Sequence, residues 1–306
     1  MKVMILYGQS LSLNVRDLAE AAERLGHEVL LGSILNMSSY VDSEVSRFWL
    51  GTREVTDIDV CLLRSFGPGS CEELTRRISM VEHMEFAGIR VVNPCYPFRR
   101  ARDKYATQYV LAKAGLPVAR TFTTESIYRG YEMAKEFGES VYKPILGSRG
   151  YGSLRFSDPD LAFDAYKMLT RVGQPLVIQE YIPNPGRDIR VFVVGEEAVA
   201  SAYKYRAGGT WKTNVAQGGR MVAEEVPEEV EKLGVEAVKA LGLIYAGVDI
   251  IESERGPIIL EVNGAPGWQA LKSVSGVDIA EKIVEYICSQ KPQVRDSRAP
   301  GSGKES

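Results

Sequence analysis

The sequence predicts an α/β protein in which an open N-terminal α/β domain precedes a two-lobed α+β region. The chain begins with an apolar strand, a helix and a second strand, over Met1–Tyr7, Asn14–Leu25 and Glu28–Leu31. Helices and strands then alternate between residues 103 and 181, and a polar hairpin follows near the C-terminus. A chain of 306 residues, 45% of them hydrophobic, is long enough for two or three such units.

The first domain is predicted to span residues 1–95. After the opening strand–helix–strand unit, Asp59–Leu63 and Ile89–Val92 are short apolar runs typical of buried strands. Glu72–Phe86 has a helical pattern between them. The turn at 93–97 contains two prolines and ends the domain.

Residues 96–190 and 191–288 are predicted as the two lobes of the α+β region, and 289–306 as a disordered tail. The tail has no large apolar residue except Val294, so it has almost nothing to bury. The elements expected in the first lobe are Asp103–Ala114, Leu116–Phe122, Tyr128–Phe137, Ser140–Ile145, Pro159–Leu169 and Leu176–Tyr181. The second lobe is expected to contain two hairpins and two helices, over 191–205, Pro227–Leu241, 248–263 and Asp278–Cys288.

The hairpin over 248–263 is the most informative feature of the chain. Folding it about Arg255 places Asp249 opposite Glu261, and side chains opposed in this way lie roughly 4.5–5.5 Å apart. Asn263 lies two residues beyond Glu261 and therefore shares its face of the strand. Oxygen donors without His or Cys suit Mg²⁺ or Mn²⁺, which usually also bind phosphate oxygens.

The two opposed carboxylates of this hairpin repel each other unless a cation lies between them. We therefore expect Asp249→Asn or Glu261→Gln to abolish turnover without lowering the melting temperature. A solvated strand face with scattered polar residues is the alternative interpretation. The register and the apolar neighbours on both strands favour the metal site.

A second motif joins a lysine to a glycine-rich loop. Lys143 ends a predicted strand, and Gly147, Ser148, Gly150 and Gly152 follow within the sequence GSRGYG. Glycines let backbone N–H groups approach an anion closely, so this loop is suited to phosphate. The spacing is neither the Walker pattern nor the dinucleotide fingerprint, and alone it fits a plain glycine-rich turn equally well. Beside a metal-binding hairpin, a phosphate loop is the better interpretation.

The segment from Ala198 to Ala223 contains four cations and no acidic residue, in a chain of net charge −3. The cations are Lys204, Arg206, Lys212 and Arg220, and Arg190 lies on the partner strand. Such segregation favours an anionic ligand over the alternative of a solvated basic face. Trp211 and several glycines make the segment loop-like, as in a loop that closes over a substrate.

Composition excludes several classes of function. A net charge of −3 and a pI near 5.7 provide no overall field for nucleic acid or an acidic membrane, so neither is expected as a partner. The four cysteines lack Cys-x-x-Cys spacing, which argues against zinc or a disulfide framework. The first strand is too short for a signal peptide and no apolar run reaches the ~18–20 residues of a membrane helix, so a cytoplasmic location is predicted. The oligomeric state stays open, with a homo-oligomer among the alternatives.

Together these motifs resemble the ATP-grasp ligases, over residues 95–288. The resemblance rests on Lys104, Lys143, the GSRGYG loop, Gln179, Glu180, Tyr181, Ile182, Asp188, Arg190, Asn214, Asp249, Glu261 and Asn263. Within the family, the chain is most similar to the glutamate-ligase branch. The stretches Trp211–Arg220 and Ala246–Ser253 look closest to the archaeal ligases that add glutamate to tetrahydromethanopterin.

The resemblance implies a two-lobed ATP-grasp domain and a ligation in two steps. ATP phosphorylates a substrate carboxylate, and the amine of L-glutamate then displaces phosphate to form an amide. By similarity, the lysines 104 and 143 and the glycine loop hold the phosphates, residues 179–182, Asp188, Asn214 and Arg206 contact the nucleotide, and Asp249, Glu261 and Asn263 hold two Mg²⁺ or Mn²⁺ ions. Arg190 and Arg206 are candidates to stabilise the acylphosphate and oxyanion, and Lys212 and Arg220 to meet acidic substrate groups.

The expected substrates are small molecules, L-glutamate and a pterin or a similar carboxylate acceptor. The alternatives are a glutamate ligase acting on a protein or peptide carboxyl terminus, a small-molecule kinase on the same fold, and a non-enzymatic nucleotide-binding subunit. An intact set of metal donors makes the last of these the least favoured. Segments 7–12 and 36–53 match nothing that the resemblance assigns, and substrate choice in this family often involves the N-terminal domain.

Overall fold

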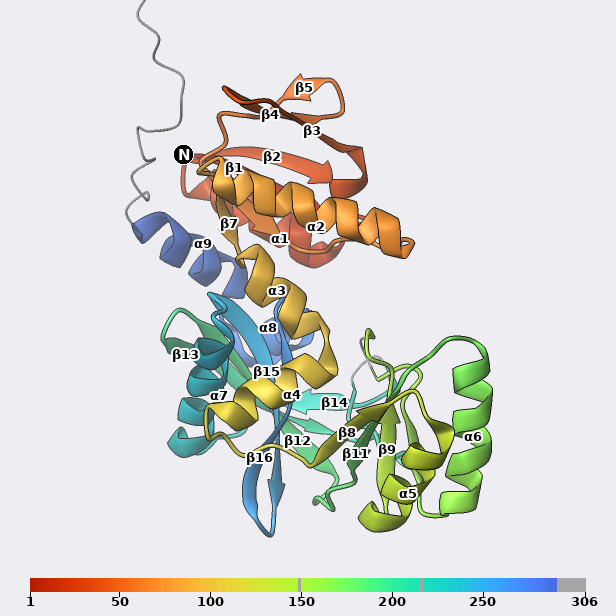
Figure 1. The fold of residues 1–306 in the computed structure, drawn as a ribbon. Helices are drawn as coiled ribbons and strands as arrows, with labels where there is room; N and C mark the ends of the chain where they lie inside the picture. Colours follow the sequence, from red (N-terminus) through yellow and green to blue (C-terminus); the bar gives the residue numbers. More distant parts are fainter. Residues whose placement is uncertain (148–149, 215–216, 291–306) are drawn as a thin grey trace, which may run out of the picture. The chain divides into compact units, whose positions relative to one another are not determined.

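The computed structural model describes residues 1–147, 150–214 and 217–290, which form two compact units. Among the described residues, one unit consists of Met1–Arg99, Gly267–Gln269 and residues 278–290, and the other of Arg100–Pro266 and Ala270–Val277. Each has its own sheets and helices (Figure 1). Within the described residues, no helix combines the length and apolarity needed to cross a bilayer. The predicted tail lies outside the described residues from position 291 onward.

The N-terminal unit is built on a parallel four-stranded sheet. Its strands, in order across the sheet, are β2 (Glu28–Ser33), β1 (Lys2–Tyr7), β6 (Val60–Leu63) and β7 (Arg90–Val92). Its helices include α1 (Leu13–Arg24) and α2 (Cys71–Phe86), and α3 (Cys95–Arg102) leads out of the unit. Helix α2 begins at a capping box, in which the Ser70 hydroxyl accepts from the Glu73 N–H and the Glu73 carboxylate accepts from the Ser70 N–H. Every residue of β6 is buried, as its apolar run predicts.

Two features of this unit differ from the prediction. Segment 36–53, to which no element was assigned, contains an antiparallel sheet after the short 3₁₀ helix η1 (Ile34–Asn36). Its strands are β3 (Met37–Val41), β4 (Ser46–Leu50) and β5 (Arg53–Glu54). Helix α9 (Ile279–Ser289), predicted as part of the last lobe, packs against α1 through a stripe of buried residues that includes Ile283 and Ile287. The predicted boundaries at 95 and 288 therefore differ from the boundaries of the compact units.

The second unit contains two antiparallel sheets (Figure 1). The sheet of the central lobe runs β10 (Leu154–Phe156), β9 (Ser140–Lys143), β11 (Leu176–Glu180) and β8 (Thr121–Thr124), and packs on α5 (Ile127–Phe137) and α6 (Pro159–Arg171). The sheet of the C-terminal lobe runs β14 (Arg220–Val222), β13 (Glu197–Tyr205), β12 (Arg187–Val194), β15 (Tyr245–Ser253) and β16 (Gly256–Asn263). It packs on α4 (Lys104–Lys113) and α7 (Glu228–Leu241), and α8 (Gln269–Ser275) follows it.

Helix α4 belongs to the C-terminal lobe, although the prediction placed it in the central lobe. Leu111 is fully buried in one apolar cluster with Val238 and Val248, so the helix packs on the five-stranded sheet. The helix begins where the Asp103 carboxylate accepts from the Ala106 N–H at 2.9 Å. This cap places Lys104 in the first turn of the helix, at the edge of the site.

Candidate functional site

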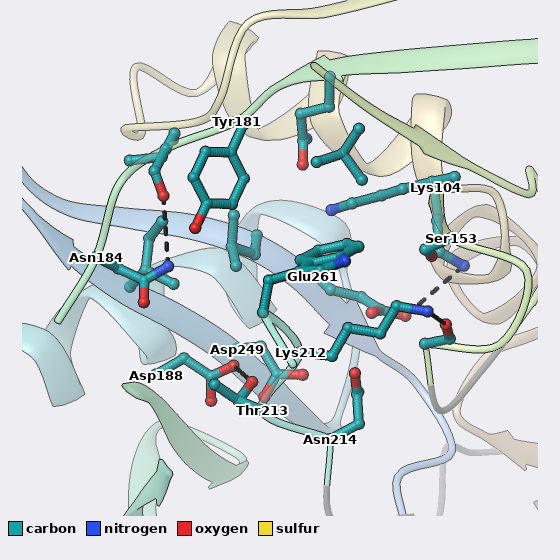
Figure 2. Close-up of a pocket in the computed structure, with 18 of the residues that line it drawn as sticks. Lys104, Ser153, Tyr181, Asn184, Asp188, Lys212, Thr213, Asn214, Asp249 and Glu261 are labelled. Atoms are coloured by element: carbon teal, nitrogen blue, oxygen red, sulfur yellow. Dashed lines mark hydrogen bonds and ion pairs between the residues drawn. The ribbon is translucent and has the colours of Figure 1, made fainter. Parts of the chain in front are cut away.

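A pocket lies between the two sheets of the second unit. Figure 2 shows Tyr181 and Lys104 on one side of it, and Asp188 and Asp249 on the other. The predicted site residues that line it are Lys104, Lys143, Gly147, Gly150, Gln179, Glu180, Tyr181, Ile182, Asp188, Lys212, Asn214, Asp249 and Glu261. Of the remaining predicted residues, Gly152, Arg190, Arg206, Arg220 and Asn263 are not among the lining residues, and Ser148 lies outside the described part of the chain.

The β15–β16 hairpin pairs Asp249 with Glu261, as predicted, although its turn differs from the one expected. The hairpin closes with Ser253 opposite Gly256, a register that alone would place Leu260 opposite Asp249. Leu260 is instead an extra residue at a shift in register, and Glu261 takes the opposed position. Such a bulge is common next to a functional site, because it re-aims a side chain.

Four charged side chains on the C-terminal sheet neutralise one another. The Arg190 guanidinium donates to both oxygens of Asp249, at 2.8 and 2.9 Å. Lys204 Nζ lies 2.8 Å from Asp249 Oδ1 and 2.8 Å from Asp188 Oδ1. The register produces this cluster, since Arg190 pairs with Asp249 and Lys204 with Asp188. None of the four side chains is more than 12% exposed.

The cluster shifts the pKa of each of its carboxyl groups. Burial opposes ionisation of Asp249, but Arg190 and Lys204 outweigh it and lower the pKa of this carboxyl. Burial raises the pKa of Asp188, with repulsion from Asp249 in support and Lys204 in opposition. Burial also opposes the charge of Lys204, but the two aspartates outweigh it and raise the pKa of the ammonium. The Asp249 side of the hairpin is therefore already compensated by cations from β12 and β13.

Arg190 reaches Asp249 because Gly247 leaves room for it. A Cβ at Gly247 would lie 2.4 Å from Arg190 Nη1, closer than any side chain could tolerate. Arg190 therefore lies over β15 and holds Asp249, whereas the prediction had it stabilise a reaction intermediate directly. The cause is the pairing of β12 with β15, which no local pattern in the sequence reveals.

The donors of the predicted metal site fit a hard cation that is shared with a ligand. Glu261 faces the pocket and is 27% exposed, and Asn263, paired with Gly247 two positions along the strand, lies on the same face. Asp249 accepts three hydrogen bonds or ion pairs, which leaves about one of its roughly four lone-pair sites. In the described residues, no three His, Cys, Asp or Glu side chains gather as a metal site. A metal ion here would therefore depend on the Asn263 carboxamide and on oxygens from a bound ligand.

Lys104 links the glycine loop to the Glu261 carboxylate. Its Nζ donates to the Gly147 carbonyl at 2.7 Å and lies 3.8 Å from Glu261 Oε1. Lys143, at the end of β9, lines the same pocket, and burial lowers its pKa to about 8, against the attraction of Glu261 and with repulsion from Lys104 in support. Two ammonium groups and a glycine-rich loop thus face one carboxylate, an arrangement suited to a multiply charged anion.

The loop after β13 closes on the glycine loop. Lys212 Nζ donates to the Gly150 carbonyl at 2.8 Å. A Cβ at Gly150 would lie 2.3 Å from Asn214 Oδ1, and its φ of +70° also favours glycine. Lys212 thus holds the glycine loop in this structure, whereas the sequence assigned it to a substrate. Trp211 forms an edge contact with Tyr181, at 6.3 Å between ring centroids.

Sequence reasoning missed Lys204 and Thr213 and misplaced Arg206. Thr213 donates its hydroxyl to Asp188, and both line the pocket with Lys204. Arg206 lies just past the end of β13 and is exposed, with its side chain beside Gly186. Arg220 begins β14 and is also exposed, with its guanidinium 5.4 Å from the Tyr205 ring centroid. Lys204, the cation of β13, therefore lines the pocket although it was not chosen as a site residue.

Comparison with known proteins places the chain in a family of ligases. The family model of the RimK-like ATP-grasp domain matches residues 101–287. The tetrahydromethanopterin:alpha-L-glutamate ligase of Methanosarcina acetivorans is 33% identical over 83% of this chain and 87% of that protein. The protein of the same name from Methanocaldococcus jannaschii is 40% identical over 76% of this chain and 79% of its own length. A probable alpha-L-glutamate ligase of Haemophilus influenzae is 29% identical over 94% of this chain and 97% of that protein.

Solved structures confirm the predicted fold. The ATP-grasp ligase PsnB, complexed with its minimal precursor, superposes with a TM-score of 0.73 at 22% identity, over 94% of this chain and 99% of that one. A RimK domain protein from Sphaerobacter thermophilus gives a TM-score of 0.72 at 22% identity, over 94% and 99% of the two chains. The family model and the named relatives confirm the predicted family and enzyme class. The chain belongs to the RimK-like ATP-grasp family and is a ligase of that family.

Proposed function

We propose that the protein is an ATP-dependent ligase that joins L-glutamate to a carboxylate of a tetrahydromethanopterin-type cofactor. The observation that carries this proposal is the pocket in which Lys104, Lys143 and the glycine loop face Asp249 and Glu261. Two relatives at 33% and 40% identity are named for glutamate and tetrahydromethanopterin, which supports these substrates. A structure of the ATP-grasp ligase PsnB, which has a similar fold, is a complex with Mg and ADP, and this supports nucleotide and Mg²⁺ in the pocket.

The proposed reaction has two steps, phosphorylation of the acceptor and amide formation. A carboxylate oxygen of the acceptor attacks the γ-phosphorus of ATP, the bond to the β–γ bridging oxygen breaks, and ADP leaves. The amine nitrogen of glutamate then attacks the acyl carbon, phosphate departs with the bonding electron pair, and the nitrogen loses a proton. Phosphoryl transfer depends mainly on positioning and on neutralising charge, and the cations of this pocket are arranged for both.

Each side chain has a part in that arrangement. Lys104 and Lys143 hold the phosphates with the glycine loop, and residues 179–182 contact the adenine through the backbone. Asp249, Glu261 and Asn263 would hold Mg²⁺ or Mn²⁺, as two ions, which would neutralise charge on the phosphoryl oxygens. Lys204 takes the role that the sequence assigned to Arg206, because it lies in the pocket. Arg190 acts through Asp249, which it orients.

The test is ADP release with candidate acceptors, measured with and without L-glutamate, followed by mass spectrometry of the product. We expect ADP formation to require both glutamate and a carboxylate acceptor, with a reduced pterin that bears a terminal carboxylate as the best acceptor. The product should gain the mass of one or more glutamyl residues. Turnover only with a peptide would replace the pterin by a peptide carboxyl terminus. ADP formation at full rate without glutamate, with a phosphorylated product, would establish a kinase instead.

Lys143 makes nucleotide binding depend on pH. Its pKa of about 8 in the ligand-free protein means that the ammonium is lost above pH 8, whereas bound phosphates favour the charged form. Affinity for Mg²⁺–ADP should therefore be flat below pH 8 and fall by up to about tenfold per pH unit above it. Because this pKa lies below the ordinary 10.5, the buried ammonium destabilises the ligand-free fold below pH 8. The free energy of unfolding should therefore rise as the pH increases from 8 toward 10.5.

Calorimetric titration with Mg²⁺–ADP between pH 7 and 10 measures this dependence. Titrations at pH 8 in two buffers of different ionisation enthalpy should show proton uptake on binding. Lys143→Met should bind more weakly and lose the break near pH 8. A break of the same size in Lys143→Met would assign the proton to another group.

A further inference from the structure

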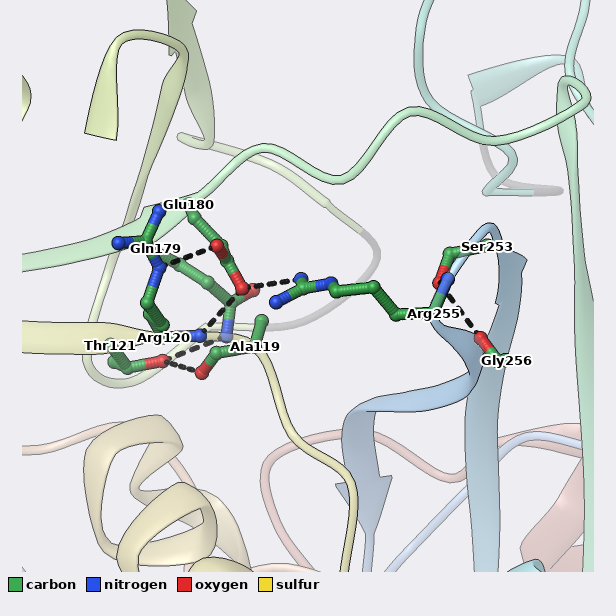
Figure 3. A network of polar contacts seen from close by, with 8 residues as sticks. All are labelled: Ala119, Arg120, Thr121, Gln179, Glu180, Ser253, Arg255 and Gly256. Atoms are coloured by element: carbon green, nitrogen blue, oxygen red, sulfur yellow. Dashed lines mark hydrogen bonds and ion pairs between the residues drawn. The ribbon is translucent and has the colours of Figure 1, made fainter.

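At the junction between the two lobes, the Glu180 carboxylate accepts hydrogen bonds from two arginines (Figure 3). Glu180 Oε1 accepts from the Arg120 backbone N–H at 3.0 Å, and Oε2 from Arg120 Nε at 2.7 Å. Arg255 Nη2 donates to Oε1 at 2.6 Å. The Glu180 side chain is 8% exposed, so these donors replace the water that it has lost.

The three residues lie at the two chain crossings between the lobes and at a hairpin turn. The chain enters the central lobe through Arg120 and leaves it just after Glu180, at the end of β11. Arg255 lies in the turn of the β15–β16 hairpin, which carries Asp249 and Glu261. Both covalent crossings and the hairpin turn are thus joined by one side chain that also lines the nucleotide pocket.

Other contacts make this junction rigid on each side. The Arg120 guanidinium stacks over the Phe137 ring at 4.9 Å, which anchors it in the central lobe. In the hairpin turn, the Ser253 hydroxyl accepts from the Arg255 N–H at 3.1 Å and donates to the Gly256 carbonyl at 2.8 Å. Beneath the junction lies a small apolar cluster, made up of Ala119, Ile182, Ile251 and Ile258. The ion pair of Arg255 with Glu180 is therefore a cross-link between two well-held segments.

We propose that Arg255 is a positioning residue that holds the two lobes closed on the nucleotide, by tying the metal-binding hairpin to the strand that contacts the adenine. The inference rests on the proposed function, because it assigns a role to nucleotide binding in this pocket. Burial opposes ionisation of Glu180, but the hydrogen bonds from Arg120 and Arg255 outweigh it and lower the pKa, so the carboxylate is charged at neutral pH. Arg255 itself is 54% exposed, and the buried Glu180 keeps both donors of Arg120 without it, so the ion pair contributes little to stability. Its removal should therefore change the geometry of the pocket more than the stability of the fold.

The experiment compares Arg255→Gln with Glu254→Gln, a neutralisation of the neighbouring exposed residue in the same turn. In Arg255→Gln we expect the dissociation constant for Mg²⁺–AMPPNP and the KM for ATP to rise about tenfold, the loss of one charge-assisted contact. The kcat should stay within about twofold and the melting temperature within about 2 °C. Glu254→Gln should match the unaltered protein in all four quantities. Arg255→Lys, whose single ammonium can still reach Glu180 Oε1, should recover most of the affinity.

Hydrogen exchange gives a readout that is independent of activity. The Glu180 N–H donates to the Arg120 carbonyl at 2.9 Å and the Tyr181 N–H to the Glu139 carbonyl at 2.9 Å. Peptides that cover 178–186 should exchange faster in ligand-free Arg255→Gln than in Glu254→Gln. Arg120→Gln combined with Arg255→Gln should weaken nucleotide binding by more than the product of the single effects, because Glu180 then loses both guanidinium partners.

Two results would overturn the proposal. Equal nucleotide affinity and equal exchange in Arg255→Gln and Glu254→Gln would show that the tie does not position the strand. A large loss of melting temperature in Arg255→Gln with unchanged KM for ATP would reduce it to a structural ion pair. The affinity titration and the hydrogen exchange use nucleotide alone, so these two measurements test the tie even where glutamate or the pterin proves to be the wrong substrate. Failure of the unaltered protein to bind nucleotide would refute the proposed function and, with it, the role of Arg255.

Discussion

Asp249→Asn should lower the melting temperature of the ligand-free protein by about 5–10 °C, whereas Glu261→Gln should leave it unchanged, although both should abolish turnover. Asp249 accepts two hydrogen bonds from Arg190 and an ion pair from Lys204, all in a buried setting. An asparagine leaves two buried cations with only Asp188 to compensate them. Removing one partner of a buried ion pair typically costs about 3–5 kcal/mol of unfolding free energy.

Glu261 provides the matched control, because it opposes Asp249 on the same hairpin. Its carboxylate is 27% exposed and its nearest cation, Lys104 Nζ, is 3.8 Å away. A partly exposed pair at this separation contributes on the order of 1 kcal/mol or less, so Glu261→Gln should keep most of the stability of the fold. From the sequence, both replacements were expected to relieve repulsion and to leave stability intact. The ion pairs of Asp249 with Arg190 and Lys204 overturn this expectation for Asp249, but not for Glu261.

Thermal unfolding of both variants without nucleotide measures the difference. The pKa of Asp249 is lowered from its ordinary 3.8, so its ionisation stabilises the fold above that value and the contribution is lost as pH falls through the folded-state pKa. The gap between the unaltered protein and Asp249→Asn should therefore be full at pH 7 and shrink in acid. Equal melting temperatures of the two variants at pH 7 would show that the cluster does not form in the ligand-free protein.

The contrast between the two hairpins of the C-terminal lobe shows what the sequence could predict about the site. In β15–β16, the predicted pairing of Asp249 with Glu261 is confirmed, although the prediction centred the turn at Arg255 and did not foresee Leu260 as an extra residue. The two deviations cancel. Alternation along each strand was sufficient to find the face, but the bulge that fixes the register has no local signature.

In β12–β13, a similar shift in register sets the position of Lys204, which lines the pocket. Val194 pairs with Glu197 and Val193 with Ala198, a register that would place Tyr203 opposite Asp188. The register shifts beyond Val193, and Asp188 pairs with Lys204 instead. Without this shift Lys204 would point to the other face of the sheet, because successive side chains alternate. The prediction included Lys204 among the cations of this segment but did not use the register to choose between Lys204 and Arg206.

Contacts between segments that are distant in sequence could not be predicted from local patterns either. Helices and strands with a clear apolar pattern were found close to their observed bounds, as in α2 and α7. The β3–β5 sheet was missed because β3 is exposed at every residue after Met37, which leaves no alternating pattern. Helix α9 was found, but its own pattern says only that one face is buried. That this face meets α1 depends on residues more than 250 positions earlier.

Lys204→Met should reduce turnover by at least about a hundredfold, whereas Arg206→Met should change it by less than about threefold. Lys204 is 3% exposed, and its ammonium is shared by Asp188 and Asp249. Methionine keeps most of the apolar stem but leaves the two carboxylates facing each other, so Asp188 should take up a proton and Asp249 should lose part of its orientation. Arg206, exposed beyond the end of β13, has no such partners in the pocket.

Turnover and nucleotide affinity measured side by side separate the possible roles of Lys204. Loss of kcat with a smaller change in affinity would place its ammonium in the chemical step, since an interaction made mainly in the transition state lowers kcat. Lys204→Arg keeps the charge and should retain more turnover than Lys204→Met, while its altered geometry prevents full recovery. Full turnover in Lys204→Met together with a large loss in Arg206→Met would return the catalytic role to Arg206. The register shift in β12–β13 would then order the sheet without contributing to the reaction.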